Sequence, residues 1–191
     1  MALPKQIEKL RVQTARLQLR PLPPEKAQIV LDYHLRNRDF FQPWNPKPSK
    51  DFYQLDCQAE KLAGDLAEAQ AGRLLRLWIF NQANPQHILG HIALSNIVWG
   101  AFRSCFLGYS IDQDQNGKGY MTEALGAAVQ LAFGPLKLHR LEANIMPKNA
   151  ASIRVVEKLG FVCEGTSPKY LKINGHWEDH LHYVIRNTAL E

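Results

Sequence analysis

A glycine-containing turn at residues 116–121, with the sequence Asn-Gly-Lys-Gly-Tyr-Met, constrains this chain more than any other feature. It follows an apolar stretch at 106–111 that is typical of a strand and leads into an apolar run at 120–133 that is typical of a helix. Glycines let a backbone approach a ligand closely, and the free N–H groups at a helix start attract anions. The turn therefore indicates a phosphate-binding site, although a tight connection without a ligand would use the same residue types.

Two familiar phosphate-binding patterns do not match this turn. The P-loop spacing G-x-x-x-x-G-K-[ST] is absent. The full G-x-G-x-x-G pattern of dinucleotide folds is also missing, together with the acidic residue that ends its second strand. A second segment at 149–161 reads Asn-Ala-Ala-Ser-Ile-Arg-Val-Val-Glu-Lys-Leu-Gly-Phe. Together, in this order and spacing, the two segments predict a pocket for a phosphate-bearing acyl carrier.

The rest of the pattern predicts one α/β domain with a mixed sheet over residues 1–191, with its core at about 14–187. Pro-containing segments at 40–46 and 84–85 are expected to be irregular, whereas Asn174-Gly175 predicts the turn of a closing hairpin. Gly134-Pro135 and Gly160 are expected to end helices. The expected strands are 14–20, 74–80, 87–94, 105–111, 140–145, 161 onward and 176–185, and the expected helices are 24–37, 52–71, 120–133 and 149–159.

Composition narrows the class of protein. The net charge of +5 suits an anionic cofactor, an acidic substrate or a ribonucleoprotein surface. The basic residues form no block, so sequence-specific nucleic-acid binding is not expected. No apolar run is long enough to span a membrane. The scattered cysteines Cys57, Cys105 and Cys163 form no metal-type pair, and they fit a reduced, cytoplasmic location.

Together the two segments resemble the GNAT superfamily of acetyl-CoA-dependent N-acetyltransferases. Residues 116–121 are similar to the superfamily's pyrophosphate loop, [QR]-x-x-G-x-[GA]. In this chain Asn116 replaces Gln or Arg, Gly119 stands at the middle glycine and Met121 replaces the final small residue. Residues 149–161 match the superfamily's asparagine, helix and strand.

The resemblance is to the RimJ/RimL type in particular, the ribosomal-protein-alanine N-acetyltransferases, and it is closest to RimJ. It covers residues from about 14 to 187. The stretches that carry it are 14–20, 41–46, 95–100, 107–111 with 117–119, 139–140 and 173–180.

This resemblance implies a GNAT-like α/β (α+β) fold, in which helices flank a twisted mixed sheet that is splayed at its middle. Acetyl-CoA would enter the splay as an extra strand, and its pantetheine amides would pair with backbone at Tyr109, Ser110 and Ile111. Asn149 would bond the pantetheine arm, cap the following helix, or do both. Lys118 would add a charged contact or be a solvated turn lysine. The implied pyrophosphate-loop residues are Asn116, Gly117, Lys118, Gly119, Tyr120, Met121 and Thr122.

The implied reaction is attack of a neutral amine on a thioester, with one proton leaving the amine and one reaching the thiolate. A peptide α-amine has a pKa near ~7.7–8.0, so its neutralisation at pH 7 costs roughly 1–1.4 kcal/mol. A lysine side chain at ~10.4 costs roughly 4.6 kcal/mol. An α-amine acetylase can therefore work with a weak base or a water relay.

The resemblance supplies catalytic candidates but no clear base. Asn144 aligns with a glutamate of some GNAT enzymes, and we expect it to orient a water or the substrate amine. Glu142, on the same strand face, either replaces that glutamate or is a surface carboxylate. RimL-type enzymes place a glutamate at the position of Leu171. Ser152 matches a proposed thiolate-side acid, with a first-turn structural serine as the alternative. Tyr109 is expected to pack rather than act as the acid.

Two other groups of residues have a structural and a functional interpretation. Trp44 would either form a wall of the peptide site or pack as an anchor of the core. His176, Glu178, His180 and His182 share a strand face that could bind zinc, but the resemblance explains this segment as hairpin structure, so no metal is expected.

The predicted function is N-α-acetylation of the N-terminal residue, alanine, of a ribosomal or similar protein, with association to the ribosome. The alternatives are acetylation of a small amine such as a polyamine or an antibiotic, and a non-catalytic acyl-CoA-binding module. An acidic, closed acceptor pocket would favour the small amine, whereas a groove open at both ends would favour a peptide.

Overall fold

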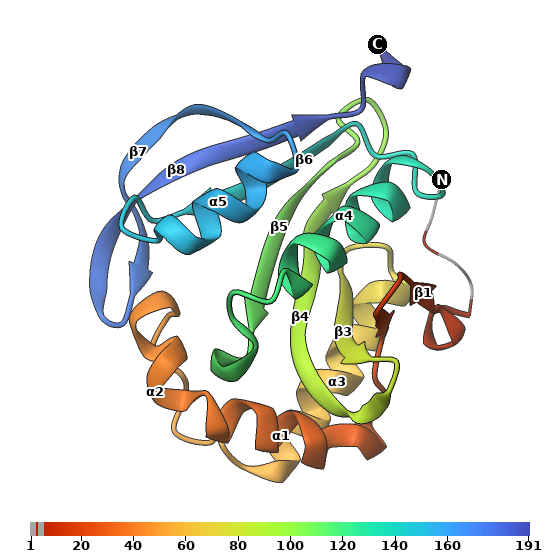
Figure 1. The fold of residues 1–191 in the computed structure, drawn as a ribbon, viewed down its shortest axis with the longest axis vertical. Helices are drawn as coiled ribbons and strands as arrows, with labels where there is room; N and C mark the ends of the chain where they lie inside the picture. The colour runs from red at the N-terminus through yellow and green to blue at the C-terminus, as the bar shows by residue number, and fades with distance from the viewer. Residues whose placement is uncertain (1–2, 4–5) are drawn as a thin grey trace.

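The protein is described by a computed structural model that covers Leu3 and residues 6–191 (Figure 1). Its strands form one eight-stranded sheet in the order β1-β2-β3-β4-β5-β6-β8-β7. Strands β5 and β6 are parallel, and the other neighbours are antiparallel, which confirms the predicted mixed sheet. The strands are β1 (Val12–Gln13), β2 (Leu17–Arg20), β3 (Leu75–Asn81), β4 (Asn84–Val98), β5 (Ser104–Ile111), β6 (Arg140–Ile145), β7 (Val162–Ile173) and β8 (His176–Arg186).

Helices cover both faces of this sheet, with α4 and α5 on one side and α1 and α3 on the other (Figure 1). The helices are α1 (Ala27–Arg36), α2 (Arg38–Phe41), α3 (Leu55–Gln70), α4 (Tyr120–Phe133) and α5 (Ala150–Lys158), with short 3₁₀ helices at Ile7–Lys9, Pro24–Lys26, Gln42–Trp44, Gln113–Gln115 and Thr188–Leu190. Within the described residues, no helix is both long and apolar enough to cross a bilayer. The predicted domain span also includes residues 1–2 and 4–5, which lie outside the described part.

Strand β3 explains why two apolar layers form. Its residues alternate between the faces of the sheet. Leu77 and Ile79 are buried in the core that contains α4 and α5, whereas Trp78 and Phe80 are buried in the core that contains α1 and α3. A strand that is apolar on both faces is stable only at the centre of a sheet covered on both sides.

The sheet is splayed at its middle, as the family resemblance implies. The β5–β6 ladder runs from the pair Ser104↔Arg140 to the pair Phe106↔Glu142 and ends there. Beyond this point β5 continues to pair with β4 as far as Ile111, and β6 continues to pair with β8 as far as Ile145. The backbone edge of β5 at residues 107–111 is therefore turned toward the opening rather than toward β6.

Three predicted boundaries were wrong. The expected strand at 14–20 is interrupted, because the amide of Leu17 donates to the Thr14 hydroxyl at 3.0 Å and closes a turn between β1 and β2. The connection expected at 84–85 lies at 82–83 instead, because Asn84 already pairs with Asn81 across the hairpin. Pro85 is tolerated in the strand because the ladder is bulged at this point and takes no hydrogen bond from its position. The expected loop at 40–46 contains helical turns, with proline in a first turn where its missing N–H is tolerated.

Several other local signals were correct, although the helix expected from about 52 to 71 begins only at Leu55 and the strand expected at 87–94 extends over Asn84–Val98. Helix α4 has the predicted bounds, and α5 begins directly after Asn149. Asn174 and Gly175 have φ angles of 44° and 89°, as a two-residue hairpin turn with a left-handed backbone requires. Gly160 has a φ of 84° just beyond α5, where a helix C-terminal glycine belongs.

Candidate active site

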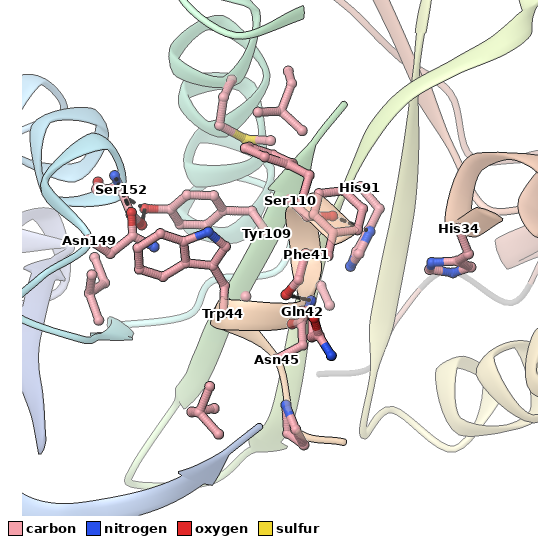
Figure 2. A pocket seen from close by; sticks show the side chains of 18 of the residues that line it. His34, Phe41, Gln42, Trp44, Asn45, His91, Tyr109, Ser110, Asn149 and Ser152 are labelled. Carbon is pink, nitrogen blue, oxygen red and sulfur yellow. Dashed lines mark hydrogen bonds between the residues drawn. The ribbon is translucent and has the colours of Figure 1, made fainter. Parts of the chain in front are cut away.

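A cavity of about 1610 Å³ lies where β5 and β6 separate. Its lining comes from β5, the first turn of α4, α5, the segment around α1 and α2, and the β7–β8 hairpin. Figure 2 shows Tyr109 and Ser152 together in this cavity, with His91 and Ser110 nearby. The cavity thus connects the two faces of the sheet through the splay.

The glycine turn forms one wall of the cavity. Gly117 and Gly119 have φ angles of 75° and 76°, which other residue types rarely adopt, and Gly119 is the N-cap of α4. Six of the seven residues 116–122 line the cavity. The exception is Lys118, whose ammonium group donates to the Gln115 side chain at 3.1 Å. Backbone N–H groups, rather than the lysine charge, are what this turn presents to a ligand.

Two ion pairs that sequence reasoning missed hold the turn in place, one of them part-buried and the other exposed. Asp112, at its start, accepts hydrogen bonds from Arg36 at 2.6 Å and from Asn37 at 3.1 Å. Burial alone would raise the pKa of Asp112, but these hydrogen bonds outweigh burial and lower it. After the turn, Glu123 accepts from Arg16 at 2.6 Å, which ties α4 to the β1–β2 connection.

Beside the turn, two hydroxyl groups meet across the cavity. The Tyr109 oxygen lies 2.6 Å from the Ser152 Oγ and 3.1 Å from the Ser152 carbonyl oxygen. Asn149 accepts a hydrogen bond from the Ser152 amide at 3.1 Å, so the expected cap of α5 is present. Burial raises the pKa of Tyr109 to about 12, although the bond to Ser152 opposes this shift. Tyr109 packs against the core, as predicted, and its hydroxyl is in addition bonded to the candidate acid.

The two catalytic candidates on β6 occupy different environments. Asn144 lines the cavity, and its Oδ1 lies 2.5 Å from the His182 Nδ1. Glu142 does not line it, and its carboxylate contacts Arg140 at 3.0 Å and the His182 ring at 3.2 Å. Leu171 also lines the cavity. Glu142, the carboxylate that could replace the family glutamate, is thus connected to the cavity-lining Asn144 through the His182 ring, which contacts both.

Aromatic and histidine side chains line the part of the cavity toward α1 and α2. Trp44 lies on the cavity wall (Figure 2), and its role at the peptide site stays a prediction. His34 and His91 also line the cavity, and sequence reasoning missed both. Burial lowers the pKa of both rings, with nearby cations adding to the effect, and the pKa of His34 falls to about 4. A single histidine within a helix or strand has no surrounding motif that would predict a place on a cavity wall.

The charged lining is strongly cationic. Of the described residues that line the cavity, Asp65 is the one carboxylate, and it is ion-paired with Arg76 at 2.7 Å. The cationic lining residues are Arg38, Lys47, Lys61, Arg76, Arg154 and Lys158. Anionic groups would be favoured here over cationic ones.

The histidine-rich strand β8 shows no metal-binding arrangement. His180 bonds the Glu178 backbone carbonyl at 3.0 Å, His182 bonds Ser167 at 2.7 Å, and the Glu178 carboxylate pairs with Lys148 at 2.7 Å. Within the described part of the chain, no group of three histidine, cysteine, aspartate or glutamate side chains could hold a metal ion.

Comparison with known proteins agrees with this fold and site. The chain matches the Acetyltransferase (GNAT) domain family over residues 16–162 and belongs to that family. The predicted class, an N-acetyltransferase that uses acetyl-CoA, is thereby confirmed.

The relatives narrow this class. The chain is 39% identical to the probable N-acetyltransferase YjcK of Bacillus subtilis, over 88% of this chain and 93% of YjcK. It is 37% identical to the ribosomal protein uS5-alanine N-acetyltransferase of Escherichia coli, over 92% of this chain and 90% of that enzyme. The resemblance to RimJ/RimL-type enzymes is therefore confirmed.

Two solved structures have the same fold. The ribosomal-protein-S5-alanine acetyltransferase of Vibrio fischeri superposes with a TM-score of 0.90 at 30% identity, over 96% of this chain and all of that one. RimJ of Mycobacterium smegmatis, solved in complex with CoA-disulfide, superposes with a TM-score of 0.85 at 30% identity, over 91% of this chain and 83% of that one.

Proposed function

We propose that this enzyme acetylates the N-terminal α-amine of a protein, with alanine as the first residue and a ribosomal protein as the acceptor. The observation that carries the proposal over a polyamine acceptor is that Asp65, the one carboxylate among the described lining residues, is already paired with Arg76. The similarity to the uS5-alanine enzyme of Escherichia coli supports the choice of acceptor. The enzyme would act on the free ribosomal protein or on the ribosome.

The geometry suits acetyl-CoA as the donor. The edge of β5 at Tyr109, Ser110 and Ile111 is turned away from a partner strand and could pair with the pantetheine amides. The backbone of residues 117–122 and the start of α4 would receive the pyrophosphate. Arg154 and Lys158 line the same cavity from α5 and would attract the remaining phosphate charge.

The chemistry that follows is direct transfer. The neutral amine nitrogen attacks the thioester carbon, the new C–N bond forms, and the C–S bond breaks. The amine loses one proton to water that Asn144 would orient, and the departing thiolate accepts one from the Ser152–Tyr109 pair. Because an α-amine is neutralised for only roughly 1–1.4 kcal/mol at pH 7, the reaction does not require a strong base.

The same cavity argues against a polyamine acceptor. A polyamine carries several positive charges, and its binding requires carboxylates that are free to pair with them. The described lining offers Asp65, which Arg76 already neutralises, among six cations.

The other alternative, a non-catalytic acyl-CoA-binding module, would bind the donor without turnover.

Mass spectrometry after incubation with acetyl-CoA tests the proposal. One peptide would carry a free N-terminal alanine and no lysine, a second would carry a blocked N-terminus and an internal lysine, and spermidine would serve as the third acceptor. We expect the mass of one acetyl group to be added to the first peptide alone. Acetylation of spermidine or of the lysine peptide in preference to the first would refute the proposal, and donor binding without any product would favour the non-catalytic module.

A further inference from the structure

Three side chains from different elements form a hydrogen-bonded chain that ends at the cavity wall. Tyr33 on α1 has its hydroxyl oxygen 2.7 Å from the Ser110 Oγ on β5. The same Oγ lies 2.9 Å from the Nδ1 of His91 on β4, the strand residue directly paired with Ser110. Ser110 and His91 line the cavity, whereas Tyr33 lies behind them and is fully buried. Figure 2 shows the bonded pair Ser110 and His91.

Burial determines the direction of these hydrogen bonds. The Tyr33 hydroxyl is shut off from water, and Ser110 is its one partner among the described residues. A buried hydroxyl proton without an acceptor is costly, so Tyr33 donates to Ser110. Ser110 then has its own proton to place, and the His91 Nδ1 is the acceptor within reach. The Nδ1 of His91 is therefore unprotonated, and in a neutral ring the proton must be on Nε2.

We infer that His91 is a hydrogen-bond donor of the acceptor site, whose Nε2–H binds the first peptide carbonyl oxygen of the substrate. Tyr33 sets this tautomer through Ser110. The inference rests on the proposed function, because it takes a peptide N-terminus as the acceptor.

The position of His91 in the sheet supports this role. Consecutive residues of a strand point to opposite faces, so Tyr109, with its partner Ser152, and Ser110, with its partner His91, lie on opposite sides of β5. The thioester would lie between them in the splay, with the thiolate-side hydroxyls on one face and the incoming acceptor on the other. The nearest carbonyl oxygen to an attacking α-amine is that of its own residue, which is the group a fixed N–H donor would hold.

The surroundings of His91 keep its ring uncharged. From α1 it faces Tyr33 and His34, from β3 it faces Trp78 and Arg76, and from β5 it faces Ser110. Burial is the largest cause that lowers the pKa of His91, and the cationic Arg76 and the His34 ring lower it further. With Nδ1 engaged and Nε2 protonated, His91 has no free lone pair, so it is not the general base.

Nitrogen NMR of the ¹⁵N-labelled protein tests the tautomer without any turnover. In the wild type between pH 6 and 8, we expect an unprotonated Nδ1 and a protonated Nε2 for His91. Tyr33→Phe removes the proton that forces Ser110 to donate toward His91, so the two tautomers should become mixed although Ser110 and the imidazole remain. A protonated Nδ1 or a charged ring in the wild type, or an unchanged tautomer in Tyr33→Phe, would overturn the inference.

Steady-state kinetics with the alanine peptide test whether His91 binds the substrate carbonyl. His91→Phe should raise KM for the peptide by about 2–10-fold, the loss expected for one neutral hydrogen bond, while KM for acetyl-CoA stays unchanged. His91→Gln can donate to the substrate and accept from Ser110, so it should restore most of the peptide affinity. An unchanged peptide KM in folded His91→Phe would disprove the contact. A wild-type enzyme that acetylates no α-amine would refute the proposed function instead, and the NMR result would still decide the tautomer.

Discussion

The hydroxyl groups of Tyr109 and Ser152 lie 2.6 Å apart, so strand β5 and helix α5 share a hydrogen bond inside the cavity. Either group can be the donor, and the difference matters for the reaction. If Tyr109 donates to the Ser152 Oγ, the serine proton is free to reach a departing thiolate. Because its pKa is raised to about 12, Tyr109 keeps its proton at neutral pH and can play this part.

The first prediction concerns this pair. Ser152→Ala should lower kcat by about 10–100-fold, because the thiolate would lose its proton donor. Tyr109→Phe should have a smaller effect of the same kind. The double variant should be no slower than Ser152→Ala, because the two hydroxyls act as one unit. Steady-state kinetics with the alanine peptide would measure all three. A wild-type kcat in folded Ser152→Ala would assign this serine a structural role.

Replacement of the turn glycine tests the cofactor site. Gly119→Ala places a side chain at a φ of 76°, a conformation that costs an L-residue about 1–2 kcal/mol, and crowds the backbone that would meet the pyrophosphate. We expect the Kd for acetyl-CoA, measured by calorimetry, to rise about tenfold or more.

Gly100→Ala is the matched control for this variant. Gly100 has a φ of 74° in the turn after β4, is not among the residues that line the cavity, and has open space around an added Cβ. It should destabilise the fold by a similar amount with unchanged acetyl-CoA affinity. Equal acetyl-CoA affinity in both variants would remove the glycine turn from the site.

The two candidates on β6 can be separated by substitution. Asn144→Ala should lower kcat/KM for the peptide by about tenfold, because a polar group that faces the reaction is lost. Glu142→Gln should leave kcat close to the wild-type value, since that carboxylate contacts Arg140 and His182 rather than the cavity. A collapse of kcat in Glu142→Gln would instead show that Glu142 acts as the base through His182.

Protein stability should depend on pH through His34. Its folded pKa is lowered to about 4, mainly by burial, from 6.5. Above pH 6.5 the ring is neutral in both states, but as the pH falls toward 4 the unfolded chain binds a proton that the folded protein does not. The free energy of unfolding should therefore fall in this window, by at most roughly 3 kcal/mol from this residue.

Urea denaturation at pH 7 and pH 5 would measure this loss. His34→Phe keeps an aromatic ring against Phe52, whose ring centroid lies 4.9 Å from that of His34, and it should reduce the difference between the two pH values. His91 contributes in the same direction, so some pH dependence should remain. An identical pH dependence in wild type and His34→Phe would contradict the assignment.

Local sequence signals were reliable where the cause of the structure is itself local. The bounds of α4, the cap at Asn149 and the turn at Asn174-Gly175 all depend on residues within a few positions of one another. The wrong boundaries near residues 14–16 and 82–85 arose where strand pairing, rather than propensity, decides where a turn falls.

The sequence by itself therefore determined the family, the mixed sheet and the glycine turn that opens α4, because these depend on short motifs and on hydrophobic periodicity. Only the tertiary structure brought Tyr109 to Ser152, linked Tyr33 to His91 through Ser110, and placed Glu142 behind His182. Such contacts depend on strand register and helix docking, which join residues far apart in the chain. A shift of one residue in strand register would turn the strand residues among these to the other face of the sheet, away from their partners.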